Sequence, residues 1–162
     1  MNCGMQKKTT MSISTSTSTS TSYQTSACRV LKLIAAPLNG RYSALFNFPL
    51  LQELYIAQCE HLKVDLDTLG RLPLLKKLSL VDHLNLTGDL NSLRSLKNTL
   101  EEIDFDGCSN VCGKLIDLAD FYHLRKLHLR ATNVTGGFRD IHHLPAMENL
   151  FFPSAGGWAK FA

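Results

Sequence analysis

The side chains best suited to chemistry in this sequence are five cysteines and six histidines. Cys108 and Cys112, together with His61 or His83 from neighbouring segments, supply the atom types that bind zinc, but their spacing is not that of a zinc finger. The odd number of cysteines and the absence of a dense short-loop cysteine framework favour a reducing compartment. We therefore expect Cys28, Cys59 and Cys108 to pack as small buried residues and expect no metal site.

Catalysis commonly requires a nucleophile and a general base that lie within hydrogen-bond distance of each other. His142 and His143 are adjacent and His128 lies elsewhere in the chain, but no Gly-x-Ser-x-Gly turn supplies a nucleophile for any of them. The pair Gly136-Gly137 fits a structural turn better than a phosphate-binding loop. The sequence therefore predicts a protein without catalytic residues and without a cofactor.

These residues belong to a repeated pattern that fixes the architecture. A block opening Leu-x-x-Leu-x-Leu, or a close variant, recurs every 23 to 25 residues, starting at Cys28, Leu51, Leu75, Leu100, Leu124 and Met147. A period of this size indicates a stacked repeat array, in which one unit cannot bury its own apolar side but successive units form a continuous core.

Each block changes its apolar spacing partway along. The first half alternates with period two, which predicts short parallel strands centred near Leu31, Leu54, Leu78, Ile103, Leu127 and Leu150. The second half spaces apolar residues by three, as in Leu90, Leu93 and Leu96, which predicts a helical or 3₁₀ turn. Four blocks place a glycine between the halves, at Gly40, Gly88, Gly113 and Gly136, where a sharp change of direction commonly needs a positive φ.

These motifs resemble the leucine-rich repeat family over residues 28–152. The turns Asn85-Leu86-Thr87-Gly88 and Asn133-Val134-Thr135-Gly136 are similar to the plant-type repeat, although the proline usual in that subfamily is missing, so the subfamily stays open. The turn position that holds Asn or Cys in the family is occupied here by Ala36, Cys59, His83, Cys108 and Thr132. The resemblance implies an α/β solenoid: a short curved array with a parallel sheet on its concave side and 3₁₀, short helical or irregular segments on its convex side.

Residues 1–27 are expected to form a disordered tail, because 14 of the 18 residues from Thr9 to Ser26 are Ser or Thr. The alternative is an organellar transit peptide, since the tract is poor in acidic residues, although it lacks the typical arginines. We predict a cytoplasmic location, with organelle targeting through this N-terminal tract as the alternative. Residues 153–162 are expected to form a C-terminal tail or a partial cap.

The charge distribution limits the classes of partner. The net charge is only +3, and the basic residues show no clustered footprint of the kind that nucleic-acid binding requires. No run of apolar residues approaches the length of a membrane span. The composition therefore argues against a nucleic-acid partner and against a membrane span.

The residues between the strand leucines point outward and form the concave surface of the expected solenoid. An acidic coil (Glu101, Glu102, Asp104, Asp106) lies between two basic ones (Lys76, Lys77; Arg125, Lys126, Arg130). The charges either pair laterally with one another or form a striped docking face for a partner of complementary charge. The predicted partner-binding residues are Tyr55, Lys77, Glu102, Asp104, Asp106, Lys126, His128, Arg130 and Phe151.

The family resemblance implies a non-catalytic protein–protein interaction module with an adaptor or recognition role, for instance in signalling. The alternative is a fragment or sensor part of a larger receptor, or a regulatory subunit of an enzyme. The partner is expected to be a protein whose identity the sequence does not reveal, and the chain is expected to act as a monomer or within a heteromeric complex.

Overall fold

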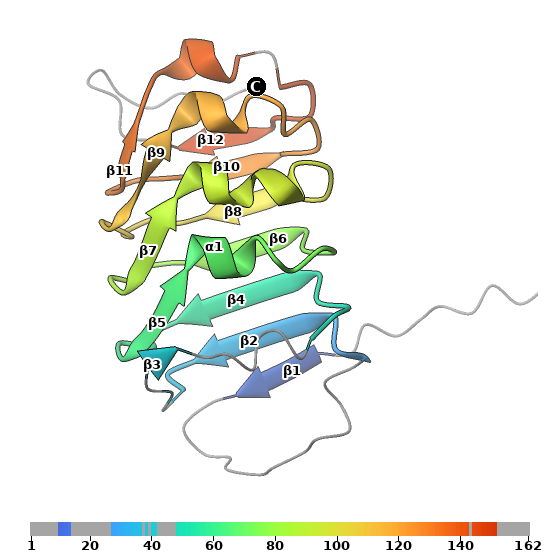
Figure 1. Cartoon of the computed structure of the whole chain (residues 1–162), viewed down its shortest axis with the longest axis vertical. Helices are drawn as coiled ribbons and strands as arrows, with labels where there is room; N and C mark the ends of the chain where they lie inside the picture. The colour runs from blue at the N-terminus through green and yellow to red at the C-terminus, as the bar shows by residue number, and fades with distance from the viewer. Residues whose placement is uncertain are drawn as a thin grey trace, which may run out of the picture.

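The computed structural model describes residues 10–13, 27–36, 38, 40–41, 48–142 and 144–151. In this part of the chain, successive coils stack in one direction, each contributing one strand to a first layer and a return segment to a second layer, which lies nearer the viewer in Figure 1. Most of the predicted N-terminal tail and all of the predicted C-terminal tail lie outside the described residues, so the proposed domain boundaries stay predictions.

The first layer is a seven-stranded sheet, and all of its pairings are parallel. The six predicted strands are confirmed and pair only with their neighbours in the stack. In spatial order the sheet contains β1 (Thr10–Ile13), β2 (Val30–Ile34), β4 (Glu53–Ala57), β6 (Lys77–Leu80), β8 (Glu102–Asp104), β10 (Lys126–His128) and β12 (Asn149–Phe151).

Strand β1 was not predicted from the sequence. It comes from the Ser/Thr-rich segment and pairs with β2 from Thr10↔Val30 to Ile13↔Leu33. The outer edge of a parallel sheet offers unpaired backbone amides and carbonyls, and an extended segment with β-branched residues can satisfy them.

The second layer contains a second parallel sheet and a series of short helices. The sheet comprises β3 (Gly40–Arg41), β5 (Leu62–Asp65), β7 (Leu86–Asp89), β9 (Val111–Lys114) and β11 (Asn133–Thr135). Helical turns follow four of these strands: α1 (Leu66–Leu69), η3 (Leu90–Leu96), η4 (Leu115–Leu118) and η5 (Phe138–Asp140), of which the last three are 3₁₀ helices. The predicted 3₁₀ and short helical segments are confirmed, whereas the second sheet was not predicted.

Three of the four block glycines hold a positive φ in this second sheet: Gly88 (+125°), Gly113 (+120°) and Gly136 (+122°). Side chains rarely adopt such angles, so glycine is the residue that lets β7, β9 and β11 lead into their helical turns.

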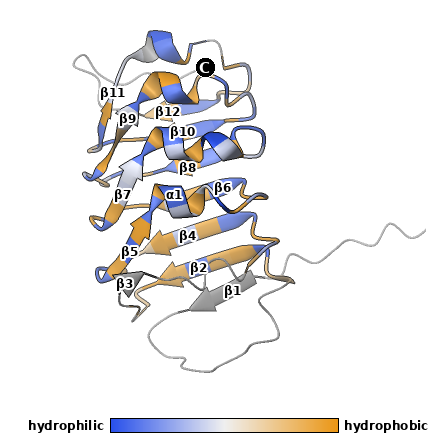
Figure 2. Cartoon of the chain, viewed as in Figure 1, coloured by the Kyte–Doolittle hydropathy of each residue, from blue (hydrophilic) through white to orange (hydrophobic). Residues whose placement is uncertain are grey.

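The core lies between the two layers and is built from the aligned leucines. In β4, β6, β8, β10 and β12 every residue that points inward is buried, and the residues that alternate with them are partly or fully exposed. Figure 2 shows apolar residues recurring from coil to coil along the stack. Because each coil packs on its neighbours, the core is continuous from Cys28 to Leu150.

Hydrogen bonds between coils tie the turns together. The thiol of Cys108 donates to the carbonyl of Leu80 in the preceding coil at 2.7 Å. Asparagine side chains form a ladder of further hydrogen bonds that was not predicted. The side-chain amides of Asn85, Asn110 and Asn133 donate to backbone carbonyls of the preceding coil, those of Glu60, Leu84 and Ser109.

His83 occupies the family's Asn/Cys turn position and introduces a pH-sensitive element. Only 4% of this residue is exposed, and within the described part of the chain its Nε2 has no hydrogen-bond partner. Burial lowers the pKa of His83 below its ordinary value of 6.5. The unfolded chain therefore takes up a proton at a pH where the folded protein does not, so stability is complete above pH 6.5 and falls as the pH decreases toward the folded pKa.

We expect the variant His83→Gln to lose less stability than the parent protein between about pH 7.5 and about pH 5. Urea unfolding at a series of pH values measures this difference. The matched control is His61→Gln, because His61 is an exposed turn residue of the preceding coil. Equal pH dependence in the parent and in His83→Gln would contradict the assignment.

Candidate functional site on the concave face

The outward side chains of β2, β4, β6, β8, β10 and β12 form the concave face. They are held rigidly, because their inward neighbours, such as Leu78 and Leu127, are anchored in the core. The strand register brings equivalent positions of successive coils opposite one another, as in Lys77↔Glu102 and Lys126↔Glu102. Neighbouring strands of a sheet lie about 4.8 Å apart, so these side chains are within reach of each other.

Glu102 lies between two lysines and pairs with both. Its Oε1 is 3.0 Å from the Nζ of Lys77 and 3.5 Å from the Nζ of Lys126. The hydrogen bond to Glu102 raises the pKa of Lys77. This cluster connects three successive strands, β6, β8 and β10.

A second line of pairs runs along the ends of the same strands. The Nζ of Lys76 is 2.8 Å from Oε1 of Glu101, and this hydrogen bond lowers the pKa of Glu101. Arg125 and Glu148 are 3.7 Å apart in the next pair of coils. The lateral pairing that was one of the two interpretations of the charge pattern is therefore present.

Asp106 and Arg130 form the tightest pair of the face. The Asp106 carboxylate accepts from Nε of Arg130 at 2.6 Å and from its backbone amide at 2.8 Å, and Nη2 lies 2.5 Å away. The Asp106 carboxylate raises the pKa of Arg130. Only 8% of Asp106 is exposed, so this acid is largely committed to an internal role.

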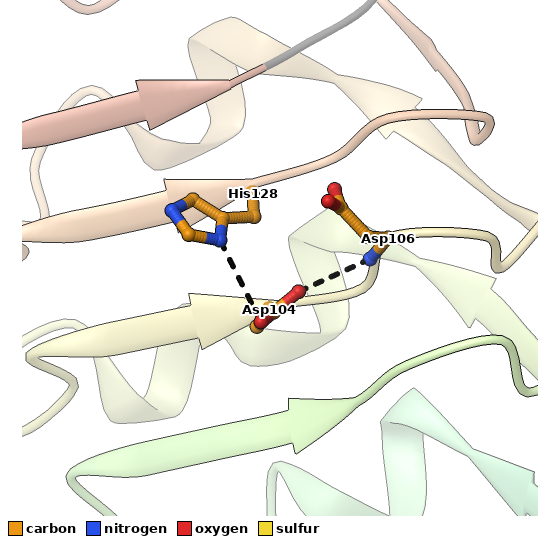
Figure 3. A group of neighbouring side chains, drawn as sticks. All are labelled: Asp104, Asp106 and His128. Carbon is orange, nitrogen blue, oxygen red and sulfur yellow. Dashed lines mark hydrogen bonds and ion pairs between the residues drawn. The ribbon is translucent and has the colours of Figure 1, made fainter. Parts of the chain in front are cut away.

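His128 and Arg130 both approach the ring of Phe151. Its Nδ1 is 3.5 Å from Oδ2 of Asp104, and its ring meets Phe151 edge-on with centroids 4.8 Å apart. The guanidinium carbon of Arg130 is 6.0 Å from the centre of the Phe151 ring, which is within the range of a cation–π contact. Figure 3 shows His128 directed toward Asp104, with the Asp106 carboxylate at the side.

Asp104, Asp106 and His128 also carry potential metal ligands, and their ligand atoms all lie within 4.8 Å of one another. The hydrogen bonds of Arg130 already occupy both oxygens of the Asp106 carboxylate. A cation could use all three groups only by displacing a guanidinium and tolerating its charge near by. The arrangement is therefore better explained as an ion-pair network than as a metal centre.

A shallow hollow of about 120 Å³ opens in the middle of the face. It is lined by the backbone or side chains of Lys77, Leu78, Ser79, Glu102, Ile103, Asp104, Lys126 and His128. Ser79 is paired with Tyr55 on one side and with Asp104 on the other, so a small side chain separates two larger ones. Five of the nine predicted site residues line this hollow.

The other four predicted residues flank it. Tyr55 is 36% exposed on β4, one strand from Ser79. Asp106, Arg130 and Phe151 form the network just described beside His128. The sequence prediction omitted Ser79 and the exposed Ile34, and the small size of Ser79 among larger outward residues was the only signal for the hollow.

Comparison with known structures identifies the architecture. A plant peptide hormone receptor, RGFR1 in complex with RGF2, aligns with a TM-score of 0.65 and 22% identity over 81% of this chain. An internalin from Listeria monocytogenes aligns with a TM-score of 0.51 and 15% identity over 79% of the chain, and an internalin C2 from the same species gives 0.51, 19% and 75%. The chain has the leucine-rich repeat fold. The sequence matches no family model, and no curated protein matches it.

This leucine-rich repeat chain spans 21%, 42% and 60% of the lengths of those three structures, less than two thirds in each case. The likeness concerns the fold, and the functions of these proteins are not transferred by it. Within the described part of the repeat array, no helix has the length and apolar character needed to cross a bilayer.

Proposed function

We propose that this chain is a non-catalytic protein–protein interaction module that binds its partner on the concave face and acts as an adaptor or recognition element. The observation that carries the proposal is the exposed Tyr55 beside the hollow over Ser79, on a sheet fixed by the buried leucines. Aromatic side chains supply large contact areas at low entropic cost, and binding energy in protein interfaces concentrates on them.

Preorganisation of the polar residues supports the same proposal. The ion pairs of Glu102, Asp106 and their partners hold these side chains in place before any partner arrives. Binding then costs less side-chain entropy than on a surface whose long polar residues are free. One of the similar structures is a peptide hormone receptor in complex with RGF2, which is an example of this fold with a bound ligand.

The test compares variants of opposite faces in affinity purification from the native organism, followed by quantitative mass spectrometry and binding measurements on the purified pair. We expect Tyr55→Ala to weaken binding about tenfold or more, because truncating a central aromatic anchor costs 2 kcal/mol or more. Reversing the charge in Asp104→Lys should weaken it as well, through repulsion within the hollow.

The matched control is Ile116→Ala on the outer side of the solenoid, where Ile116 is 50% exposed in η4. This variant should retain every partner. A partner that binds Tyr55→Ala and Asp104→Lys as well as it binds the parent, but loses affinity for Ile116→Ala, would place the binding site on the outer side.

The alternative proposal is that the same face forms the sensor part of a larger receptor or belongs to a regulatory subunit of an enzyme. The limited share of the receptor structure that this chain spans, 21%, is the observation in its favour. Immunoblotting of native extracts distinguishes the two, because a separate adaptor should migrate near the 18.0 kDa of this chain.

A further inference from the structure

The charges around the hollow compensate each other within the protein. Two cations, Lys77 and Lys126, and two anions, Glu102 and Asp104, line it, so their formal charges cancel when His128 is neutral. Glu102 is paired with both lysines. Asp104 contacts His128 and also accepts a hydrogen bond from the backbone amide of Asp106 at 3.3 Å.

A charged ligand group gains little from such an environment. A carboxylate entering the hollow meets Glu102 and Asp104 as well as the lysines, and an ammonium or guanidinium group meets Lys77 and Lys126. Either group loses hydration, and either one has to compete with an existing ion pair for its counter-charge. An uncharged group leaves all the pairs intact.

The side of the hollow toward β2 has no net charge either, because its outward residues include one cation, Lys32, and one anion, Glu53. Tyr55 of β4 lies in register between Lys32 of β2 and Ser79 of β6. Ile34 at the end of β2 is 41% exposed, which gives a second apolar contact on the same face as Tyr55. A segment that runs from the hollow toward β2 thus meets an aromatic and an aliphatic side chain, with two opposite charges beside them.

His128 does not offer a further polar contact to a ligand in the hollow. Its Nδ1 faces Asp104, and its Nε2 is buried from solvent, with no hydrogen-bond partner among the described residues. The histidine therefore gives a charged ligand group no advantage over an uncharged one.

We propose that the occupant of the concave face is an uncharged, extended segment of a protein partner, which places one side chain in the hollow over Ser79 and packs against Tyr55. This inference rests on the proposed function and specifies its ligand. The hollow, with a volume of about 120 Å³, has room for one side chain of the partner. Because no net charge is exchanged, affinity is nearly independent of ionic strength.

The experiment selects peptides from a phage-displayed library of random peptides on the immobilised full-length protein. Selected peptides are then synthesised and their affinities measured by calorimetry in about 50 mM and about 500 mM NaCl. We expect selected sequences with an uncharged central segment and a Kd that changes less than about threefold between the two salt concentrations. Ser79→Trp, which fills the hollow, should weaken binding about tenfold or more, and Ser79→Ala, which keeps it open, should not.

The outcomes separate the inference from the proposed function. Peptides with charged centres, or affinities that fall tenfold in high salt while still depending on Tyr55 and Ser79, overturn the inference and leave the concave site intact. Peptides whose affinities are the same for the parent, Tyr55→Ala and Ser79→Trp bind elsewhere and overturn both. Circular dichroism tests whether Ser79→Trp is folded, and Tyr55→Ala provides an independent variant that removes volume instead of adding it.

Discussion

Replacing Leu127 by alanine is expected to lower the free energy of unfolding by roughly 2–5 kcal/mol. Leu127 is fully buried in β10, where its register partners are Ile103 of β8 and Leu150 of β12, both also fully buried. Truncation removes apolar contacts and leaves a cavity that the coils on both sides cannot close without moving their own strands. A domain of this size has a total stability of about 5–15 kcal/mol, so the loss is a large fraction of it.

Urea unfolding and thermal melting measure the effect, with an expected decrease of several degrees per variant at about 2–4 °C per kcal/mol. Leu78→Ala in β6, two strands away, is expected to behave in the same way. The matched control is Lys63→Ala, because Lys63 is exposed on β5. If Leu127→Ala and Leu78→Ala melted within about a degree of the parent, the assignment of the inward-facing positions would be wrong.

The strand register could be predicted because its signal is local and is repeated. Alternation of buried and outward residues appears within each short strand, as in Leu78 and Leu80 of β6, and the same pattern recurs in every coil. A single block would be ambiguous, but aligned blocks fix which leucines share a layer. The glycines gave a second local signal, because a positive φ at Gly88, Gly113 and Gly136 is a property of single residues.

Most of the second sheet left no comparable signal. Buried residues alternate in β5, but in β7 only Leu86 is buried, and the following Thr87, Gly88 and Asp89 show no apolar alternation. The strands of this sheet form because the stacking of one coil on the next brings their backbones together, as in the pairing of Val64 with Leu86. Strand β1 lies in a Ser/Thr-rich tract and becomes a strand by pairing with β2.

The asparagine ladder was missed for a similar reason. The family pattern directs attention to the turn position of Cys108, whereas Asn110 makes an inter-coil bond two residues further on. Its acceptor, the carbonyl of Leu84, lies 26 residues away in the chain. A hydrogen bond of this kind can be identified only once the two turns are placed side by side.

The candidate site could be predicted as a surface but not as a set of interactions. The sequence predicted that Glu102 lies between Lys77 and Lys126 on the concave surface, and the structure shows that both lysines share its carboxylate. The repeat alignment determines which outward residues are neighbours, whereas side-chain reach determines which of them pair. The hollow over Ser79 depends on the side chains of three adjacent strands, so no single segment encodes it.

Replacing Gly113 by alanine is expected to destabilise the protein by roughly 2–6 kcal/mol, from two separate causes. Its φ of +120° lies in a region that is nearly restricted to glycine, and such strain costs about 1–3 kcal/mol. An added Cβ would also lie 2.8 Å from the backbone nitrogen of Leu90 and 2.9 Å from Oδ1 of Asp89, in the preceding coil. Relieving this overlap requires a shift between coils, which costs about a further 1–3 kcal/mol.

Gly137→Ala provides the matched control, because an added Cβ at Gly137 meets no atom within 4 Å. This variant should stay within about 0.5 kcal/mol of the parent in urea unfolding. The comparison separates the general effect of introducing alanine for glycine from the demands of the inter-coil junction, since both glycines lie close to the point where a strand of the second sheet leads into its helical turn. Equal stabilities of Gly113→Ala and Gly137→Ala would show that β9 and η3 can separate at no cost. The close packing of coil on coil would then not be what fixes the geometry of the concave face.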